Sequence, residues 1–283
     1  MFSSILISFK TRILTISNID KGAVSVSLFK KLGQEDADDS IEAAPKTGFP
    51  RLWELVSRDL WDNFRAGFLA LLGCIPFAVG LSFSVLSHSL IFVPVLGLIG
   101  GAIAGPELCA LADTLLRGQR DEASFWWHTY RKAWKRSAKS ALLPGAVSGL
   151  LLAFQLFLFI FAEDLELEFT TMVALVMGTA LLLGLSLYLW PQLALMQLSF
   201  GQLLKNSALL FLGRLSRSIA ALAVLATYIG LSIQFSELAL ALLPFLNLWL
   251  PAFLALFIIY PVLEDTFKLE VQFHGEKRSP QDN

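Results

Sequence analysis

The sequence predicts an all-α protein: a polytopic transmembrane helical bundle of about six spans, with an amphipathic interfacial helix on the cytoplasmic side. Of its 283 residues, 55% are hydrophobic and 16% charged, against roughly 45–50% and about 25% in soluble domains. The apolar residues form runs of about 20, long enough to cross a hydrocarbon core of about 30 Å. This composition excludes an ordinary soluble enzyme, and a net charge of −1 gives no reason to expect nucleic acid as a partner.

The first 48 residues are expected to form a poorly ordered cytoplasmic extension. Lys10 and Arg12 interrupt the apolar start too early for a signal peptide. Residues 32–48 then carry five acidic side chains with Gly and Pro, which is typical of a solvated linker. We therefore expect a transmembrane domain over 49–268 and a cytoplasmic tail over 269–283.

Six apolar runs are long enough to span a membrane, and a weaker amphipathic segment, 51–65, leads into the first of them. Ser87–Ser89 separates the first two runs and predicts a tight antiparallel hairpin. Pro244 and Pro251 interrupt the last run, so an interfacial or re-entrant piece at 238–250 is the alternative there. The expected spans are 66–87, 90–112, 141–162, 171–194, 218–236 and 244–263.

The basic residues indicate the orientation. With six spans and both ends on one side, that side receives all 22 Lys and Arg residues, and the opposite side receives none. Loops rich in Lys and Arg stay in the cytoplasm. The sequence therefore predicts a multi-pass membrane protein with both termini in the cytoplasm.

Residues 123–139 are expected to form the interfacial helix. At 100° per residue the aromatic side chains fall within one arc of about 100° and the basic side chains fill the opposite arc. Such a helix lies in the headgroup layer, and docking of a partner protein through the same face is the alternative. The residues named for this surface are Trp126, Trp127, Tyr130, Trp134, Arg131 and Lys135.

Small residues at intervals of four mark two helix-packing faces. Gly97, Gly101 and Gly105 form such a stripe in the second span, and Gly145 and Gly149 form one in the third. Stripes of this kind let helix backbones approach closely in lipid. Packing within one subunit is the leading interpretation, and a seam between two copies is the alternative.

Ionisable and polar residues near the apolar runs are the candidate polar site, because burying a charge in the bilayer costs at least about 2.5–3.5 kcal/mol. Glu107 follows Gly105-Pro106, which we expect to interrupt the helix. Glu107 is expected to face water or to pair with a basic residue such as Arg117. The alternative is a polar site near the cytoplasmic mouth. Polar residues downstream are expected on one side of a continuous helix. They are expected to form hydrogen bonds between helices, and a second polar site is the alternative. The candidates are Glu107, Asp113, Gln192, Gln202 and Asn206.

No motif for catalysis, a metal or a cofactor is present. His88, His128 and His274 lie in separate loops, and the sequence has no HExxH, no P-loop and no GxSxG. Cys74 and Cys109 are expected at similar depth in the first hairpin, as buried small apolar residues. We therefore expect no enzyme activity and no cofactor.

Two stretches resemble the YesL-like family of bacterial membrane proteins. One is Gly105-Pro106 followed by the Ala-Leu helix end; the other joins Tyr188-Leu189-Trp190-Pro191 to Leu204-Lys205-Asn206. The resemblance covers roughly residues 50–268. It implies a polytopic bacterial protein of unknown biochemical function, often encoded beside carbohydrate ABC-transporter genes, and it supplies no catalytic residue.

Two classes of function fit these observations. The first is a non-catalytic accessory or assembly partner of another membrane system, such as a carbohydrate ABC transporter. The second is a small solute transporter or channel, which calls for a polar midplane site and an internal repeat. We expect the first class, because the polar groups gather near the cytoplasmic ends and the two halves show no clear similarity. The partners are then the lipid bilayer and a membrane protein, with a homo-oligomer left open.

Overall fold

The computed structural model describes residues 48–122, 125–196 and 198–267, and within them it holds helices and no strand. Contacts divide the chain into two units, Met1–Leu52 and Trp53–Asn283, and the packing described below is that of the second. The expected extension 1–48 and tail 269–283 lie outside the described residues, apart from Gly48.

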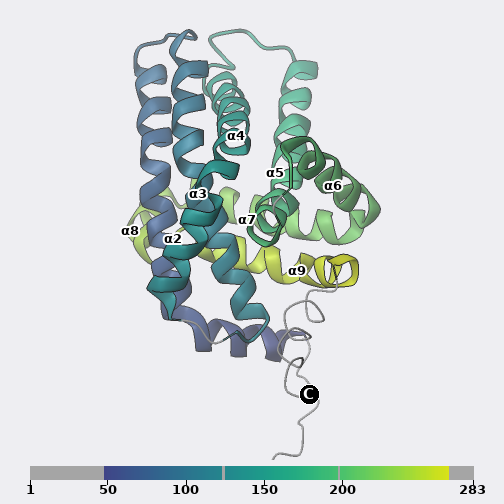
Figure 1. Cartoon of the computed structure of the whole chain (residues 1–283). Helices are drawn as coiled ribbons and strands as arrows, with labels where there is room; N and C mark the ends of the chain where they lie inside the picture. The colour runs from purple at the N-terminus through teal and green to yellow at the C-terminus, as the bar shows by residue number, and fades with distance from the viewer. Residues whose placement is uncertain (1–47, 123–124, 197, 268–283) are drawn as a thin grey trace, which may run out of the picture. The chain divides into compact units, whose positions relative to one another are not determined.

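Eight helices follow one another in the described part of the chain. Six are long and apolar enough to cross a membrane, which confirms the all-helical, multi-pass class. The bounds are α2 Phe49–Leu86, α3 Phe92–Gln119, α4 Trp126–Ile160, α5 Phe169–Leu195, α6 Phe200–Gly213, α7 Leu215–Gln234, α8 Ser236–Leu246 and α9 Trp249–Phe267 (Figure 1).

The amphipathic segments are not separate helices. Residues 126–139 form the first turns of α4, which continues unbroken into the third expected span, and residues 51–65 are continuous with the first span in α2. The helix also continues through Pro106 in α3 and through Pro144 in α4. The helix break expected at Gly105-Pro106 was therefore wrong, because a single missing N–H is tolerated where neighbouring helices support the backbone.

The first two spans form the expected tight hairpin. Its turn holds His88 at a positive φ of 48°, and the His88 ring packs edge-on against Phe161 at 5.1 Å between centroids. Along the hairpin, glycine permits close approach: a Cβ on Gly100 would lie 2.5 Å from the Cα of Phe77. The turn is thereby fixed against the C-terminal end of α4.

The glycine stripes of α3 and α4 face each other in antiparallel register. A Cβ on Gly101 would overlap the carbonyl oxygen of Gly145 and lie 2.7 Å from the Cα of Gly149. A Cβ on Gly105 would lie 2.5 Å from the carbonyl oxygen of Ala141. Both stripes are thus filled by backbone of the same chain, which leaves no room there for a second copy.

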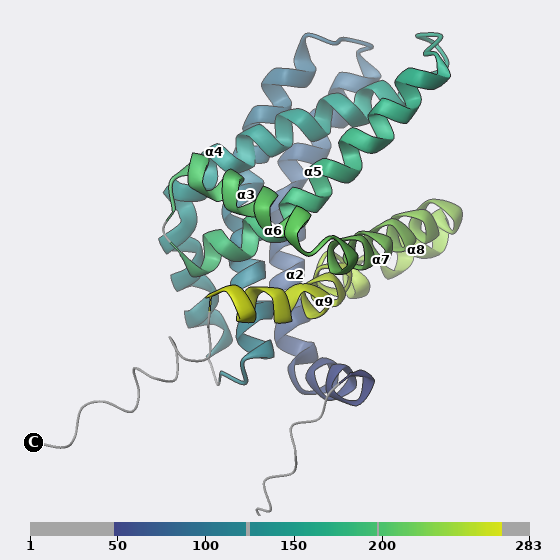
Figure 2. The same cartoon turned by 90° about the vertical axis from the view of Figure 1, so that its right-hand side faces the viewer.

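The last three helices have a different direction. In Figures 1 and 2, α7 and α9 run across α2 and α3 rather than alongside them. The short α8 follows α7 and occupies most of the stretch 238–250, for which a separate piece was the alternative expectation. The sixth expected span, 244–263, therefore begins only at Trp249.

Asn247 fixes the junction between α8 and α9. Its side-chain oxygen accepts a hydrogen bond from the backbone N–H of Trp249 at 3.1 Å, and its carbonyl oxygen accepts one from the hydroxyl of Tyr228 at 3.2 Å. The same side-chain oxygen lies against Gly67 of α2, where a Cβ would overlap it. Asn247 therefore joins the crosswise helices to the first span.

Candidate functional site

Asp113 is a buried carboxylate near the end of α3, only 2% exposed. Arg117 donates to one of its oxygens at 2.8 Å, and Arg136 of α4 donates to the other at 3.0 Å. Arg136 also donates to the carbonyl oxygen of Ala194 at 2.6 Å. This network connects α3, α4 and the C-terminal end of α5, and its charge-assisted bonds are stronger than neutral ones.

Glu107 lies about 1.7 helical turns earlier on α3. Its carboxylate accepts a hydrogen bond from the hydroxyl of Tyr130 at 2.6 Å, and its side chain packs on Gly73 of α2. The suggested pairing of Glu107 with Arg117 was wrong, because Arg117 is engaged by Asp113 and Glu122. Glu107 and Asp113 therefore contact different partners and do not form one site.

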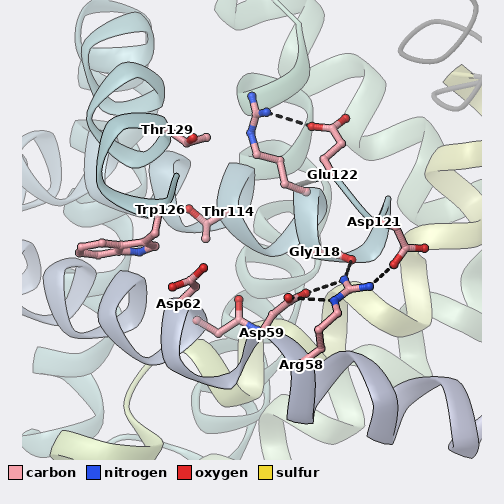
Figure 3. A pocket seen from close by; sticks show the side chains of 11 residues that line it. Arg58, Asp59, Asp62, Thr114, Gly118, Asp121, Glu122, Trp126 and Thr129 are labelled. Carbon is pink, nitrogen blue, oxygen red and sulfur yellow. Dashed lines mark hydrogen bonds and ion pairs between the residues drawn. The ribbon is translucent and has the colours of Figure 1, made fainter. Parts of the chain in front are cut away.

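A pocket of about 340 Å³ opens where α2, the C-terminal end of α3 and the N-terminal end of α4 meet (Figure 3). Most of its lining residues are polar or charged, and they come from all three helices and the turn after α3. The lining residues are Arg58, Asp59, Asp62, Asn63, Thr114, Arg117, Gly118, Asp121, Glu122, Trp126 and Thr129.

One guanidinium in the pocket wall is used within the protein. Arg58 donates to Asp59 at 2.7 Å, to the carbonyl oxygen of Gly118 at 2.7 Å, and to Asp121 (Figure 3). These bonds connect α2 to the turn that follows α3. Arg58 therefore closes one side of the pocket.

The second guanidinium is also paired. Arg117 donates to Glu122 at 2.9 Å in addition to its bond with Asp113. By contrast, Asp62 has no hydrogen bond or ion pair with any residue that the structure describes. Asp62 precedes the expected span 66–87; burial raises its pKa, the charge of Arg65 opposes this, and that of Asp59 adds to it.

Two hydrogen-bond donors in the wall have no partner among the residues that the structure describes. Asn63 is 2% exposed, and its amide nitrogen is buried without a hydrogen bond, as is the indole nitrogen of Trp126. The guanidinium of Arg65 lies between two rings, 5.2 Å from that of Trp61 and 5.4 Å from that of Trp126. This cation–π packing holds Trp126 in place at the pocket wall.

The downstream polar candidates are divided between two helices. Gln192 is fully buried near the end of α5 and donates to the hydroxyl of Ser207 at 3.2 Å. The chain leaves helical conformation after Leu195, and α6 begins at Phe200 with a capping box made by Ser199 and Gln202. The expected continuous helix was therefore wrong, because the capping side chains start a new helix.

Of the remaining candidates on α6, Gln202 is exposed and Asn206 is half-buried. Gln202 accepts a hydrogen bond from the backbone N–H of Ser199 at 3.2 Å, which accounts for its position. The structure therefore does not bring Gln202 together with Glu107 or Asp113 through any described contact.

The aromatic arc of α4 is split by burial. Tyr130 is 3% exposed and bonded to Glu107, and Trp126 lies against it with ring centroids 6.2 Å apart. Trp127 and Trp134 are 55% and 37% exposed. The exposed side chains where the aromatic and basic arcs meet form what we term the aromatic–basic face: Trp127, Arg131, Trp134 and Lys135.

The pocket was missed from the sequence. Asp62 lies on the polar side of the amphipathic segment 51–65, and Asp59 and Asn63 were not singled out. The signal that was present is the spacing of Asp59 and Asn63, four residues apart on one helix face. Their proximity to the turn after α3 depends on Arg58 reaching Asp121, which no local pattern encodes.

The thiols and carboxylates show no metal or redox arrangement in the part of the chain that the structure covers. Cys74 and Cys109 are both free thiols. No group of three His, Cys, Asp or Glu side chains among the described residues is placed to hold a metal ion. What the site offers chemically is hydrogen bonding and charge.

No known family, no curated protein and no solved structure matches the chain. The resemblance to the YesL-like family therefore finds no support in these comparisons.

Proposed function

We propose that this multi-pass membrane protein is a non-catalytic accessory or assembly partner of another membrane protein. The aromatic–basic face is the surface that binds the partner. The observation that carries the proposal is the exposure of Trp127 and Trp134 beside cationic side chains, while the neighbouring Trp126 and Tyr130 already anchor α4.

The anchoring of α4 supports a role beyond attachment to headgroups. Tyr130 is fixed by Glu107, and Arg136 is fixed by Asp113 and Ala194. Because these bonds already hold the segment, the exposed tryptophans are not needed for its position. Buried tryptophan is the side chain most often found to dominate binding energy at protein interfaces.

The charge of the face indicates the chemistry of the partner. Arg131 and Lys135 are exposed beside the two tryptophans, so a complementary surface carries acidic side chains around an apolar groove. We propose as the partner a carbohydrate ABC transporter, which the resemblance to the YesL-like family implied. The proposal places both in a bacterial inner membrane.

The proposal includes the orientation of the protein. The ends of α3 and α4 that carry the network of Asp113 lie opposite the α2–α3 and α4–α5 connections (Figure 1). The α4–α5 connection contains Glu163, Asp164 and Glu166 and no basic residue. By the rule that basic segments stay inside, the aromatic–basic face is cytoplasmic.

The test is photo-cross-linking in native membranes. A photoreactive amino acid at position 127 or 134 should give the same cross-linked protein, and one at exposed Phe169 at the opposite end should not. Trp127→Ala with Trp134→Ala should lower capture of that protein at least tenfold, without changing expression or membrane insertion. Cross-links to lipid alone at both positions contradict the proposal.

A second candidate is a solute transporter or channel with its polar site at the cytoplasmic mouth. The pocket of about 340 Å³ at that end favours it. The glycine seam of α3 and α4, where backbones are in direct contact, supports the accessory function instead because it leaves no room for a polar path between these helices. Transport of a solute by the pure protein in liposomes, without a partner, would establish the second candidate.

A further inference from the structure

The pocket between α2, α3 and α4 is not part of the aromatic–basic face. Its wall carries four carboxylates and two guanidiniums, and both guanidiniums are bonded to acidic side chains of the protein. An anionic ligand would therefore meet no uncommitted positive group among the described lining residues. The excess of carboxylates favours a cation.

Asp62 is the group that would receive the cation. The other three acidic lining side chains, Asp59, Asp121 and Glu122, are each held by an arginine. Asp62 has no such bond with any residue of the described ranges and is half-buried at the pocket. A carboxylate in this position forms a charge-assisted hydrogen bond with an ammonium group.

Asn63 and Trp126 specify a second feature of the ligand. Both line the pocket, and both have a buried N–H group without an acceptor in the described part of the chain. A buried donor left unsatisfied costs about 1–3 kcal/mol. An oxygen atom of a ligand would satisfy one or both donors, so the ligand carries an acceptor as well as a positive charge.

We propose that this pocket binds a small ammonium compound with a nearby oxygen, of the amino-alcohol class. The ammonium group donates to the carboxylate of Asp62, and the oxygen accepts from the amide of Asn63 or the indole of Trp126. This chemistry has two sources beside a membrane: a free amino alcohol, and the headgroup of phosphatidylethanolamine.

A divalent metal fits the pocket less well. Asp59, Asp121 and Glu122 are bonded to arginines, and no described trio of His, Cys, Asp or Glu is close enough to hold an ion. Asn63 and Trp126 present N–H donors, which repel a metal and suit an acceptor oxygen. The mixture of one free carboxylate with neutral donors therefore selects an organic cation.

The experiment is equilibrium dialysis of radiolabelled ethanolamine against the full-length protein in detergent without phosphatidylethanolamine. Ethylene glycol, which replaces the ammonium by a hydroxyl, should compete at least tenfold more weakly than ethanolamine. Propylamine, which lacks the oxygen, should compete more weakly as well. The lipid source is tested by the melting temperature in nanodiscs of phosphatidylethanolamine against nanodiscs of phosphatidylglycerol.

Asp62→Asn is the decisive variant, because it keeps the shape of the side chain and removes its charge. It should weaken ethanolamine binding at least tenfold. If the lipid is the ligand, it should abolish the stabilisation by phosphatidylethanolamine. The matched control is Asp164→Asn in the α4–α5 connection, which should change neither. Binding of free ethanolamine supports a soluble ligand, and stabilisation by phosphatidylethanolamine alone supports the lipid.

Three results overturn the proposal. The first is no saturable binding of ethanolamine together with equal melting temperatures in the two kinds of nanodisc. The others are equal competition by ethylene glycol and ethanolamine, and equal effects of Asp62→Asn and Asp164→Asn. The comparison of ethanolamine with propylamine and ethylene glycol uses the wild-type protein, so it does not depend on how a variant folds. The dialysis needs no partner protein, and its outcome is therefore independent of the cross-linking test of the accessory function.

Discussion

The helices α2 to α5 and the helices α6 to α9 both include long apolar helices but are assembled by different means. In the first group α3 and α4 touch backbone to backbone through glycine. The second group is held by side chains: Tyr188 of α5 bonds to Ser218 of α7 at 2.8 Å, and Asn247 links α8 to α9. Long apolar runs thus show that a helix avoids water, whereas small-residue stripes show which helix it contacts.

The direction of the helices differs as well. Helices α2 and α3 run side by side, whereas α7 and α9 cross them (Figures 1 and 2). Six helices have the composition of a span, but only a helix close to the bundle direction crosses the same bilayer as its neighbours. Hydropathy measures length and polarity and contains no information on tilt.

Cysteine labelling in intact cells gives the largest expected effect, an all-or-none difference between the two regions. In a background with Cys74→Ala and Cys109→Ala, Ser87→Cys and His128→Cys should react with an impermeant reagent from opposite sides. Because α7 runs crosswise, Ser216→Cys at its start and Ser236→Cys just beyond its end should react from the same side. Reaction of those two positions from opposite sides would show that α7 spans the membrane and remove this difference between the regions.

Glycine substitution gives the next largest effect. Gly101→Leu should lower the free energy of unfolding by about 3 kcal/mol, the upper part of the range for overpacking, since its Cβ meets backbone atoms of α4. Gly230→Leu in α7 is the matched control, because nothing lies within 4 Å of a Cβ there. Melting in detergent measures both; similar melting temperatures for the two variants would contradict the importance of the seam.

Removal of one hydroxyl gives the smallest effect and concerns the second region. Tyr188→Phe breaks the buried bond to Ser218 that connects α5 to α7, and should cost about 1 kcal/mol. Tyr260→Phe in α9 provides a comparison at another tyrosine of a long apolar helix. Thermal melting and protease resistance of the α5–α7 region check the result, and an unchanged value for Tyr188→Phe would mean that packing alone holds α7.

The candidate site was predictable only in part. Glu107 and Asp113 were identified because ionisable groups are unusual beside apolar runs, and both proved to be bonded across helices. Their partners were not identified, because Tyr130 and Arg136 lie 23 residues away from them along the chain. Gln192 and Gln202 were assigned to one helix, since a pattern of spacing does not reveal the capping box that starts α6.

The sequence by itself determined the class of this protein, its long apolar helices, its tight first hairpin and the four-residue spacing of its glycines. These properties are local: hydrophobicity over about 20 residues and the periodicity of one helix encode them. The tertiary structure alone decided that the two glycine stripes face each other, that α7 and α9 run crosswise, and that Asn63, Asp62 and Trp126 line one pocket. Such features depend on contacts between distant segments, whose geometry is set by the packing of whole helices and not by any short stretch of sequence.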